Sequence, residues 1–145
     1  MSDIKEILSN NKTIAMVGVS KDPSKPSTIV MKYMQKYGYK VIPVNPSAKG
    51  EKILGEIVFG KLDEIKIPID IVDVFRPSKE ALNIAKDTVK INAKVLWLQL
   101  GISSNEAKTL VEKNNIDYIE NRCTKMEYQK IFLKKNQAFP VLINR

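Results

Sequence analysis

Short apolar runs alternate with amphipathic segments along most of this chain. The apolar runs predict strands, over residues 14–17, 40–44, 69–75, 95–100 and 117–119. Segments with apolar residues three and four positions apart predict helices, over residues 3–11, 27–37, 77–92 and 125–134. A further helix is expected to begin at Ser103, because Ser103-x-x-Glu106 has the spacing of a capping box. This alternation is typical of a parallel sheet with helices on both faces.

We therefore predict a single-domain, three-layer, Rossmann-like doubly wound α/β fold with a mainly parallel sheet. A chain of 145 residues is long enough to bury such a core without metals or disulfides. We expect a lead-in helix at residues 1–11, the main domain at 12–133 and a tail at 134–145. The apolar tail segment 138–143 suggests packing on the domain, on an unidentified partner protein or on a second copy in a homodimer.

Polar residues follow most of the predicted strands. Right-handed crossovers bring the carboxyl ends of parallel strands to one edge of the sheet. The segments expected there are the loop after Val17, Asn45, Phe75-Arg76, Gln99–Gly101 and Asn121-Arg122. Ligands of open α/β sheets bind at this edge, where the strand order reverses. The sequence thus predicts a site at the carboxyl edge.

The loop after the first strand, residues 18–26, has the features of an anion site. Gly18 ends the strand, and a helix begins near Ser27, so free N–H groups and the helix dipole favour an anion there. Neighbouring serines and lysines add hydroxyl donors and positive charge. Ser20 and Pro23 stand where a G-x-G-x-x-G fingerprint needs glycines, so the loop departs from the dinucleotide pattern.

Two residues at the predicted edge have both a functional and a structural interpretation. Asn45 ends the second strand, where a NAD-binding domain usually has an acidic residue, and it could equally form a turn with Pro46. Arg76 could hold a phosphate or form a surface ion pair with Asp73 or Glu80.

Four further residues, on or after the last three predicted strands, are mostly expected inside the domain. Asp73 is expected to be hydrogen-bonded for structural reasons, and Trp97 to belong to the core. Gln99 needs polar partners at the end of an apolar strand. Cys123 is expected to be a buried thiol, with a redox role beside a ligand as the alternative.

The composition narrows the function classes. The net charge of +8 suits anionic ligands, but the basic residues are scattered and do not alternate with aromatic ones, which argues against nucleic acid. The chain has no histidine and one cysteine, which excludes histidine-based triads and a disulfide framework and disfavours a metal site. The lack of a signal sequence or a long apolar run favours a cytoplasmic protein that does not enter membranes.

Six motifs in the same order resemble the CoA-binding protein family: VGVSKDPSKPS, VIPVNP, GEKILGE, DIVDVFRPS, WLQLGI and ENRCTKMEY. The resemblance covers residues 12–132 and implies a Rossmann-like domain similar to the CoA-binding domain of the succinyl-CoA synthetase alpha subunit. It implies coenzyme A as the ligand, bound at the carboxyl edge of the sheet. The larger synthetases of the superfamily use a phosphohistidine and further domains, so the resemblance does not extend to synthetase activity.

The resemblance also implies which residues surround the ligand. Those expected around the phosphates are Gly18, Val19, Ser20, Lys25, Pro26 and Ser27. Those expected at the nucleotide end and along the cleft are Asn45, Pro46, Phe75, Arg76 and Pro77. Those expected to close the site from the other side are Gln99, Leu100, Gly101, Asn121, Arg122 and Cys123. The family more often has arginine at the position of Lys25.

These observations favour a protein that binds coenzyme A or an acyl-CoA without catalysis of its own, since no catalytic constellation emerges from the residues. One alternative is a small NADP-dependent oxidoreductase. Another is a redox or regulatory protein in which Cys123 forms a mixed disulfide with CoA.

Overall fold

The computed structural model describes residues 3–134, and the predicted tail segment 138–143 lies outside them. The main helices and strands are α1 (Ile4–Asn10), β1 (Thr13–Val17), α2 (Pro26–Lys36), β2 (Lys40–Val44), β5 (Ile71–Val74), α3 (Ala81–Lys90), β6 (Val95–Leu98), α4 (Asn105–Glu112), β7 (Asp117–Ile119) and α5 (Thr124–Tyr128). The short elements are the 3-10 helices η1 (Pro46–Ala48), η2 (Leu62–Glu64) and η3 (Ser78–Glu80), the strands β3 (Lys52–Ile53) and β4 (Glu56–Ile57), and the π-helix η4 (Gln129–Leu133).

Five parallel strands form the sheet in the order β2-β1-β5-β6-β7. β1 lies in the middle of the first three strands, and Ile14 on β1 is opposite Val41 on one side and Ile71 on the other. β3 and β4 form a separate antiparallel pair. The predicted Rossmann-like α/β fold with a mainly parallel sheet is therefore confirmed.

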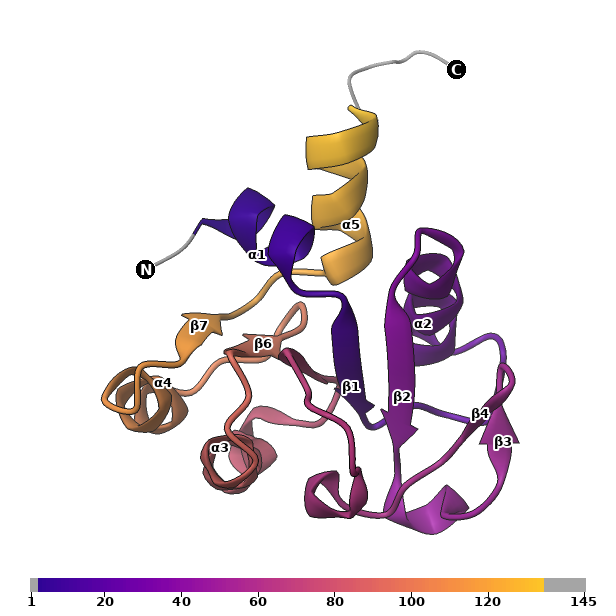
Figure 1. The fold of residues 1–145 in the computed structure, drawn as a ribbon, viewed down its shortest axis with the longest axis horizontal. Helices are drawn as coiled ribbons and strands as arrows, with labels where there is room; N and C mark the ends of the chain where they lie inside the picture. The colour runs from indigo at the N-terminus through magenta and orange to yellow at the C-terminus, as the bar shows by residue number, and fades with distance from the viewer. Residues whose placement is uncertain (1–2, 135–145) are drawn as a thin grey trace.

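Helices cover both faces of the sheet. Figure 1 shows α1, α2 and α5 on one side and α3 and α4 on the other. The first core contains Met16, Met31 and the fully buried Trp97, whereas the second contains Val72 and Ile84. Because alternate residues of a strand point to opposite faces, each central strand supplies both cores, which explains why the strand sequences are apolar throughout. The three predicted layers are present.

The start of the fourth main helix differs from its prediction. Ser104, not Ser103, caps α4: its backbone is extended, and its hydroxyl accepts a hydrogen bond from the Ala107 N–H at 3.1 Å. The Ser103 N–H is instead bonded to the Ser78 hydroxyl, in the turn before α3. The capping-box spacing pointed to the wrong serine because both serines offer a hydroxyl and tertiary contacts decide between them.

Two connections run in opposite directions from the centre of the sheet. The chain leaves β1 through α2 on one face, and leaves β5 through α3 on the other face. Because β1 and β5 are neighbours, the loops after them diverge and leave a crevice at the carboxyl edge. Within residues 3–134, no helix has the length and apolar character needed to cross a membrane.

Candidate functional site

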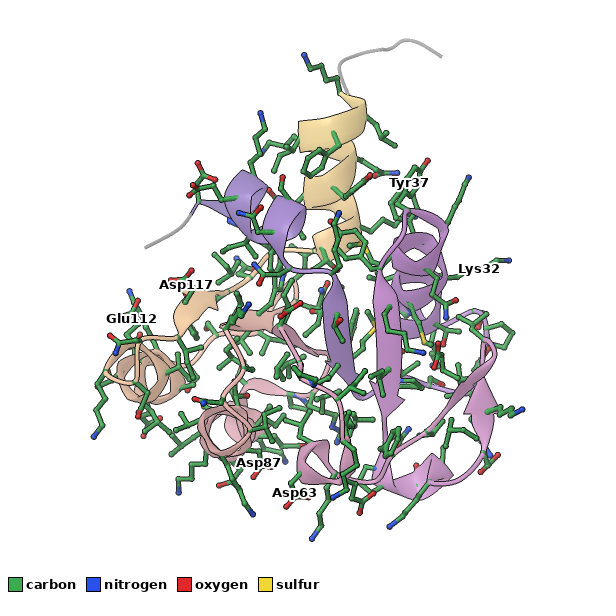
Figure 2. The ribbon with its side chains drawn as sticks, in the orientation of Figure 1. Lys32, Tyr37, Asp63, Asp87, Glu112 and Asp117 are labelled. Carbon is green, nitrogen blue, oxygen red and sulfur yellow. The ribbon has the colours of Figure 1, made fainter. Side chains whose placement is uncertain are left out.

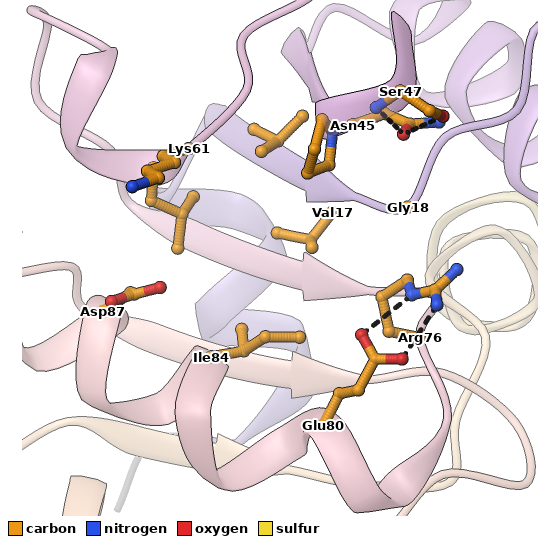
Figure 3. A pocket seen from close by; sticks show the side chains of 12 residues that line it. Val17, Gly18, Asn45, Ser47, Lys61, Arg76, Glu80, Ile84 and Asp87 are labelled. Carbon is orange, nitrogen blue, oxygen red and sulfur yellow. Dashed lines mark hydrogen bonds and ion pairs between the residues drawn. The ribbon is translucent and has the colours of Figure 1, made fainter. Parts of the chain in front are cut away.

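A pocket of about 400 Å³ lies at the carboxyl ends of β2, β1 and β5 (Figure 3). Its floor is apolar, because Val17, Val44, Leu62 and Ile84 all belong to or pack on the second core. Polar groups surround this floor. The residues that line the pocket are Val17, Gly18, Val44, Asn45, Pro46, Ser47, Lys61, Leu62, Arg76, Glu80, Ile84 and Asp87. An apolar floor with a polar rim is the usual form of a small-molecule site.

The loop after β1 is held together by hydrogen bonds within itself. The Ser20 N–H donates to the Ser27 hydroxyl at 3.0 Å, and the Thr28 hydroxyl donates to the Ser20 carbonyl at 2.6 Å. The Asp22 carboxylate accepts from the N–H and the hydroxyl of Ser24, which lowers the pKa of Asp22 below its ordinary value. The loop is thus ordered by its own side chains.

The N-terminus of α2 directly follows this loop. Lys25 is the N-cap residue and makes no side-chain capping bond, and Pro26 occupies the first turn. The next helical positions, Ser27 and Thr28, are buried, with their hydroxyls engaged by the loop. A helix N-terminus without a side-chain cap keeps donor capacity and positive potential for an anion.

Gly18 allows the close approach of two loops. Its φ is +95°, and a Cβ at this position would lie 2.9 Å from the Arg76 Cδ and 3.2 Å from the Phe75 carbonyl oxygen. Glycine is the residue that tolerates both the positive φ and the contact. The arginine stem therefore lies directly over the start of the loop after β1.

Gly18→Ala is expected to lower the free energy of unfolding by about 2–3 kcal/mol, because it adds a steric contact to an unfavourable φ. Gly38→Ala is the matched control: Gly38 has a φ of +96° with no atom within 4 Å of the added Cβ. It should cost only about 1 kcal/mol. Urea unfolding of both variants measures the difference, and equal costs would show that the Arg76 contact yields freely.

Asn45 connects the end of β2 to the loop after β1. Its side-chain amide donates to the Val19 carbonyl at 2.9 Å, and its side-chain oxygen accepts from the Ser47 N–H and hydroxyl. The turn interpretation is thus confirmed, since Asn45 caps η1. Its side chain has no negative charge, so the pocket wall here does not repel a phosphate.

Arg76 forms a two-point ion pair with Glu80. The Arg76 Nε lies 3.0 Å from the Glu80 Oε1, and the Arg76 Nη2 lies 2.8 Å from the Glu80 Oε2. The pair lowers the pKa of Glu80 and raises that of Arg76, so both side chains are charged at neutral pH. The ion pair weighed as the alternative for Arg76 is present, and it lies inside the pocket wall.

Gln99 points into the interior and not into the pocket. Its side-chain amide donates to the Asp73 Oδ1 at 2.6 Å and to the Thr124 hydroxyl at 3.1 Å, and that hydroxyl donates to the Asp73 Oδ2 at 3.1 Å. Asp73 is fully buried, and this burial raises its pKa to about 7. The network provides the partners that Gln99 was expected to need, and Asp73 has the structural hydrogen bonds predicted for it.

The remaining predicted residues lie at the carboxyl ends of β6 and β7, away from the pocket lining. The Asn121 side chain accepts from the Gly101 N–H at 2.7 Å, and Arg122 pairs with Glu127 at 3.4 Å. Cys123 is a buried thiol, as expected, and burial raises its pKa. A raised pKa leaves little thiolate at neutral pH, which disfavours the mixed-disulfide alternative.

Of the predicted residues, the pocket brings together Gly18, Asn45, Pro46 and Arg76. Phe75 and Pro77 flank Arg76, half-buried and exposed respectively. The pocket is also lined by four residues that were not predicted for the site, namely Lys61, Glu80, Ile84 and Asp87. Glu80, Ile84 and Asp87 are spaced along one face of a helix, but this spacing does not distinguish a pocket wall from an ordinary core contact.

Charged side chains outside the pocket are dispersed over the molecule. Figure 2 shows the labelled Lys32 at the right of the molecule, Asp63 at the bottom, and Glu112 and Asp117 at the left. Many surface lysines are in ion pairs, such as Lys21 with Glu51 at 3.2 Å and Lys90 with Asp63 at 3.1 Å. In the part of the chain described, no group of three or more acidic, histidine or cysteine side chains could hold a metal ion.

The fold and the pocket define an open parallel α/β protein of the Rossmann-like type, with its crevice at the point where the strand order reverses. The chain belongs to the CoA binding domain family, whose pattern it matches over residues 12–129. This finding confirms the family resemblance seen in the six motifs.

The related proteins agree with this assignment. The chain is 39% identical over 127 residues to the uncharacterized protein YneT of Bacillus subtilis (strain 168), covering 88% of this chain and 93% of that one. A solved structure of a Thermus thermophilus protein (cell-free ID.343) is 36% identical with a TM-score of 0.87, covering 91% and 100%. The acetyl-coenzyme A synthetase 1 of Ca. Korarchaeum cryptofilum, 24% identical with a TM-score of 0.67, covers 80% of this chain and 27% of that one, and shares the fold.

Proposed function

We propose that this protein binds coenzyme A, free or acylated, at the carboxyl edge of its sheet. The observation that carries the proposal is the 400 Å³ pocket that reaches Gly18, the first residue of the loop that leads from β1 to the N-terminus of α2, which has no side-chain cap. Membership of the CoA binding domain family supports coenzyme A as the ligand.

The proposed binding mode follows from the chemistry of each part. The phosphates lie against the loop formed by Gly18, Val19 and Ser20 and against the start of α2 at Lys25–Ser27, where the helix dipole stabilises negative charge. Arg76, whose stem passes close to Gly18, contributes a charge-assisted hydrogen bond. The apolar floor at Val17 and Ile84 receives the adenine ring.

The pantetheine arm then extends along the carboxyl ends of β6 and β7. This direction takes it past Phe75 and Leu100 towards Asn121 and Arg122. Leu100 is a large apolar side chain that is 56% exposed, and an apolar surface suits the arm or an acyl group. The proposal includes no catalytic step, because the chain has no histidine and Cys123 is a buried thiol with a raised pKa.

Calorimetric titration with CoA, dephospho-CoA, NADPH and ATP in parallel tests the proposal. We expect micromolar binding of CoA that weakens when the 3′-phosphate is absent. NADPH binding without a CoA signal would instead support a nicotinamide-dependent enzyme and contradict the proposal.

Arg76→Ala is expected to weaken CoA binding about tenfold, because it removes a charge-assisted hydrogen bond to phosphate. Lys94→Ala is the matched control for net charge, since Lys94 pairs with Asp70 at the opposite edge of the sheet. The same titration measures both variants. If both bind CoA as the wild type does, Arg76 does not contact the ligand.

A further inference from the structure

The pocket wall includes a negatively charged side chain, Glu80, next to Arg76. Figure 3 shows Arg76 and Glu80 pointing toward one another at one end of the pocket, whereas Asp87 lies farther along the same helix. Glu80 occupies the Nε and Nη2 of Arg76 at 3.0 and 2.8 Å. This edge of a guanidinium is the one that holds a phosphate through two parallel hydrogen bonds. The carboxylate therefore takes the place that a phosphate oxygen pair would take.

The ion pair between Arg76 and Glu80 is expected to contribute little to the stability of the fold. The side chains of Arg76 and Glu80 are 47% and 37% exposed, and ion pairs as exposed as this contribute little to stability. The Arg76 stem passes so close to Gly18 that a Cβ added there would lie 2.9 Å from the Arg76 Cδ. A neutral residue at position 80 should therefore leave the fold and the arginine stem in place.

We propose that Glu80 is a specificity-determining residue, which competes with the ligand phosphate for Arg76 and so sets the affinity and charge selectivity of the site. This inference rests on the proposed function. Before binding, Glu80 neutralises the guanidinium, so ligands with little negative charge gain nothing from Arg76. A phosphoanion with more charge than a carboxylate displaces Glu80 and takes over its two hydrogen bonds.

The experiment compares Glu80→Gln with Asp87→Asn by calorimetric titration with CoA and with inorganic pyrophosphate. Both variants remove one negative charge from the pocket wall, but only Glu80 is bonded to Arg76. We expect Glu80→Gln to tighten binding of both ligands about twofold to fivefold. Asp87→Asn should give a smaller gain, because Asp87 makes no hydrogen bond to Arg76 and acts on the ligand only through its charge.

A double-mutant cycle with Arg76→Ala separates competition from general repulsion. In the Arg76→Ala background, Glu80→Gln should give no gain, because the group for which Glu80 competes is absent. An equal gain for Asp87→Asn, or the same gain without Arg76, would overturn the inference. So would weaker binding by Glu80→Gln, which would mean that Glu80 orients Arg76 for the ligand.

The two ligands distinguish failure of this inference from failure of the proposed function. If the wild type binds CoA and Glu80→Gln brings no gain, only the role of Glu80 is wrong. If CoA does not bind but pyrophosphate binds more tightly to Glu80→Gln, the competition stands and CoA is the wrong ligand. If neither ligand binds any variant, both proposals fail.

Discussion

Ser20→Asp is expected to abolish CoA binding in the micromolar range while the protein remains folded. Ser20 lies between Gly18 and the start of α2, with its N–H bonded to the Ser27 hydroxyl and its own hydroxyl accepting from the Asp22 N–H. A carboxylate here would face the proposed position of the phosphates and weaken binding by on the order of a hundredfold, since buried like charges cost several kcal/mol. Calorimetric titration with CoA measures the loss.

A second aspartate substitution controls for net charge. Ser9 is exposed on α1, which leads into the amino end of β1 at the opposite edge of the sheet. Ser9→Asp changes the net charge equally and should leave CoA affinity within about twofold, because salt screens charges over such separations. Circular dichroism of both variants verifies the fold. Unchanged CoA binding by folded Ser20→Asp would show that the phosphates are held elsewhere.

The stability of the wild-type protein is expected to fall as the pH rises from 5 to 7. The buried Asp73 has its pKa raised to about 7 from an ordinary value of 3.8. The folded state therefore binds this proton more tightly than the unfolded state, so the free energy of unfolding decreases between the two pKa values. The expected loss is about 2–3 kcal/mol between pH 5 and 7. Urea unfolding at several pH values measures it.

Asp73→Asn should remove this pH dependence. Asparagine has the same shape and can keep hydrogen bonds to Gln99 and Thr124. The chain has no histidine, the side chain that ordinarily titrates in this range, so no histidine adds to the pH dependence of stability between pH 5 and 7. Asp87→Asn, the same change on an exposed residue, should retain the wild-type slope. A slope shared by the wild type and Asp73→Asn would show that Asp73 does not titrate between pH 5 and 7.

The protonation of Asp73 matters for the site because of where its partners lie. Gln99 directly follows β6 and Thr124 begins α5, so the network joins the ends of two elements beneath the proposed path of the pantetheine arm. Loss of the proton leaves a buried carboxylate with two donors, which is costly in an apolar interior. Comparing CoA affinity at pH 5 and 8 would reveal whether this network also supports binding.

Much of the fold could be predicted because its signals are local. The apolar run at 14–17, Gly18 after it and the amphipathic helix that follows each depend on residues close together in sequence, and all three are present. Strand ends were less accurate: the run predicted to extend to Phe75 pairs as β5 only to Val74, since the chain turns there towards α3. The predicted division of the chain into a lead-in helix, a main domain that begins at residue 12 and a tail that begins at residue 134 remains a prediction.

The site was predictable only as a location. Arg76 follows a strand, so the crossover rule was enough to put it at the carboxyl edge. The sequence allowed either a phosphate contact or an ion pair for Arg76. The 3-10 turn η3 and the start of α3 bring Glu80 back within 2.8 Å of its guanidinium. Lys61, which precedes η2, lines the same pocket, and no pattern in the sequence predicts this position.

The sequence by itself determined the main elements, the parallel sheet, the family, and the edge of the sheet at which the pocket lies. Hydrophobic period, crossover handedness and short motifs all depend on residues close together in the sequence. The tertiary structure decided which polar groups meet. Asp73, Gln99 and Thr124 are 25 to 51 residues apart, and they make one network because sheet register and helix packing bring them together. The backbone turn between Arg76 and Glu80 forms the ion pair that the sequence offered as one of two interpretations, and places it inside the proposed phosphate site.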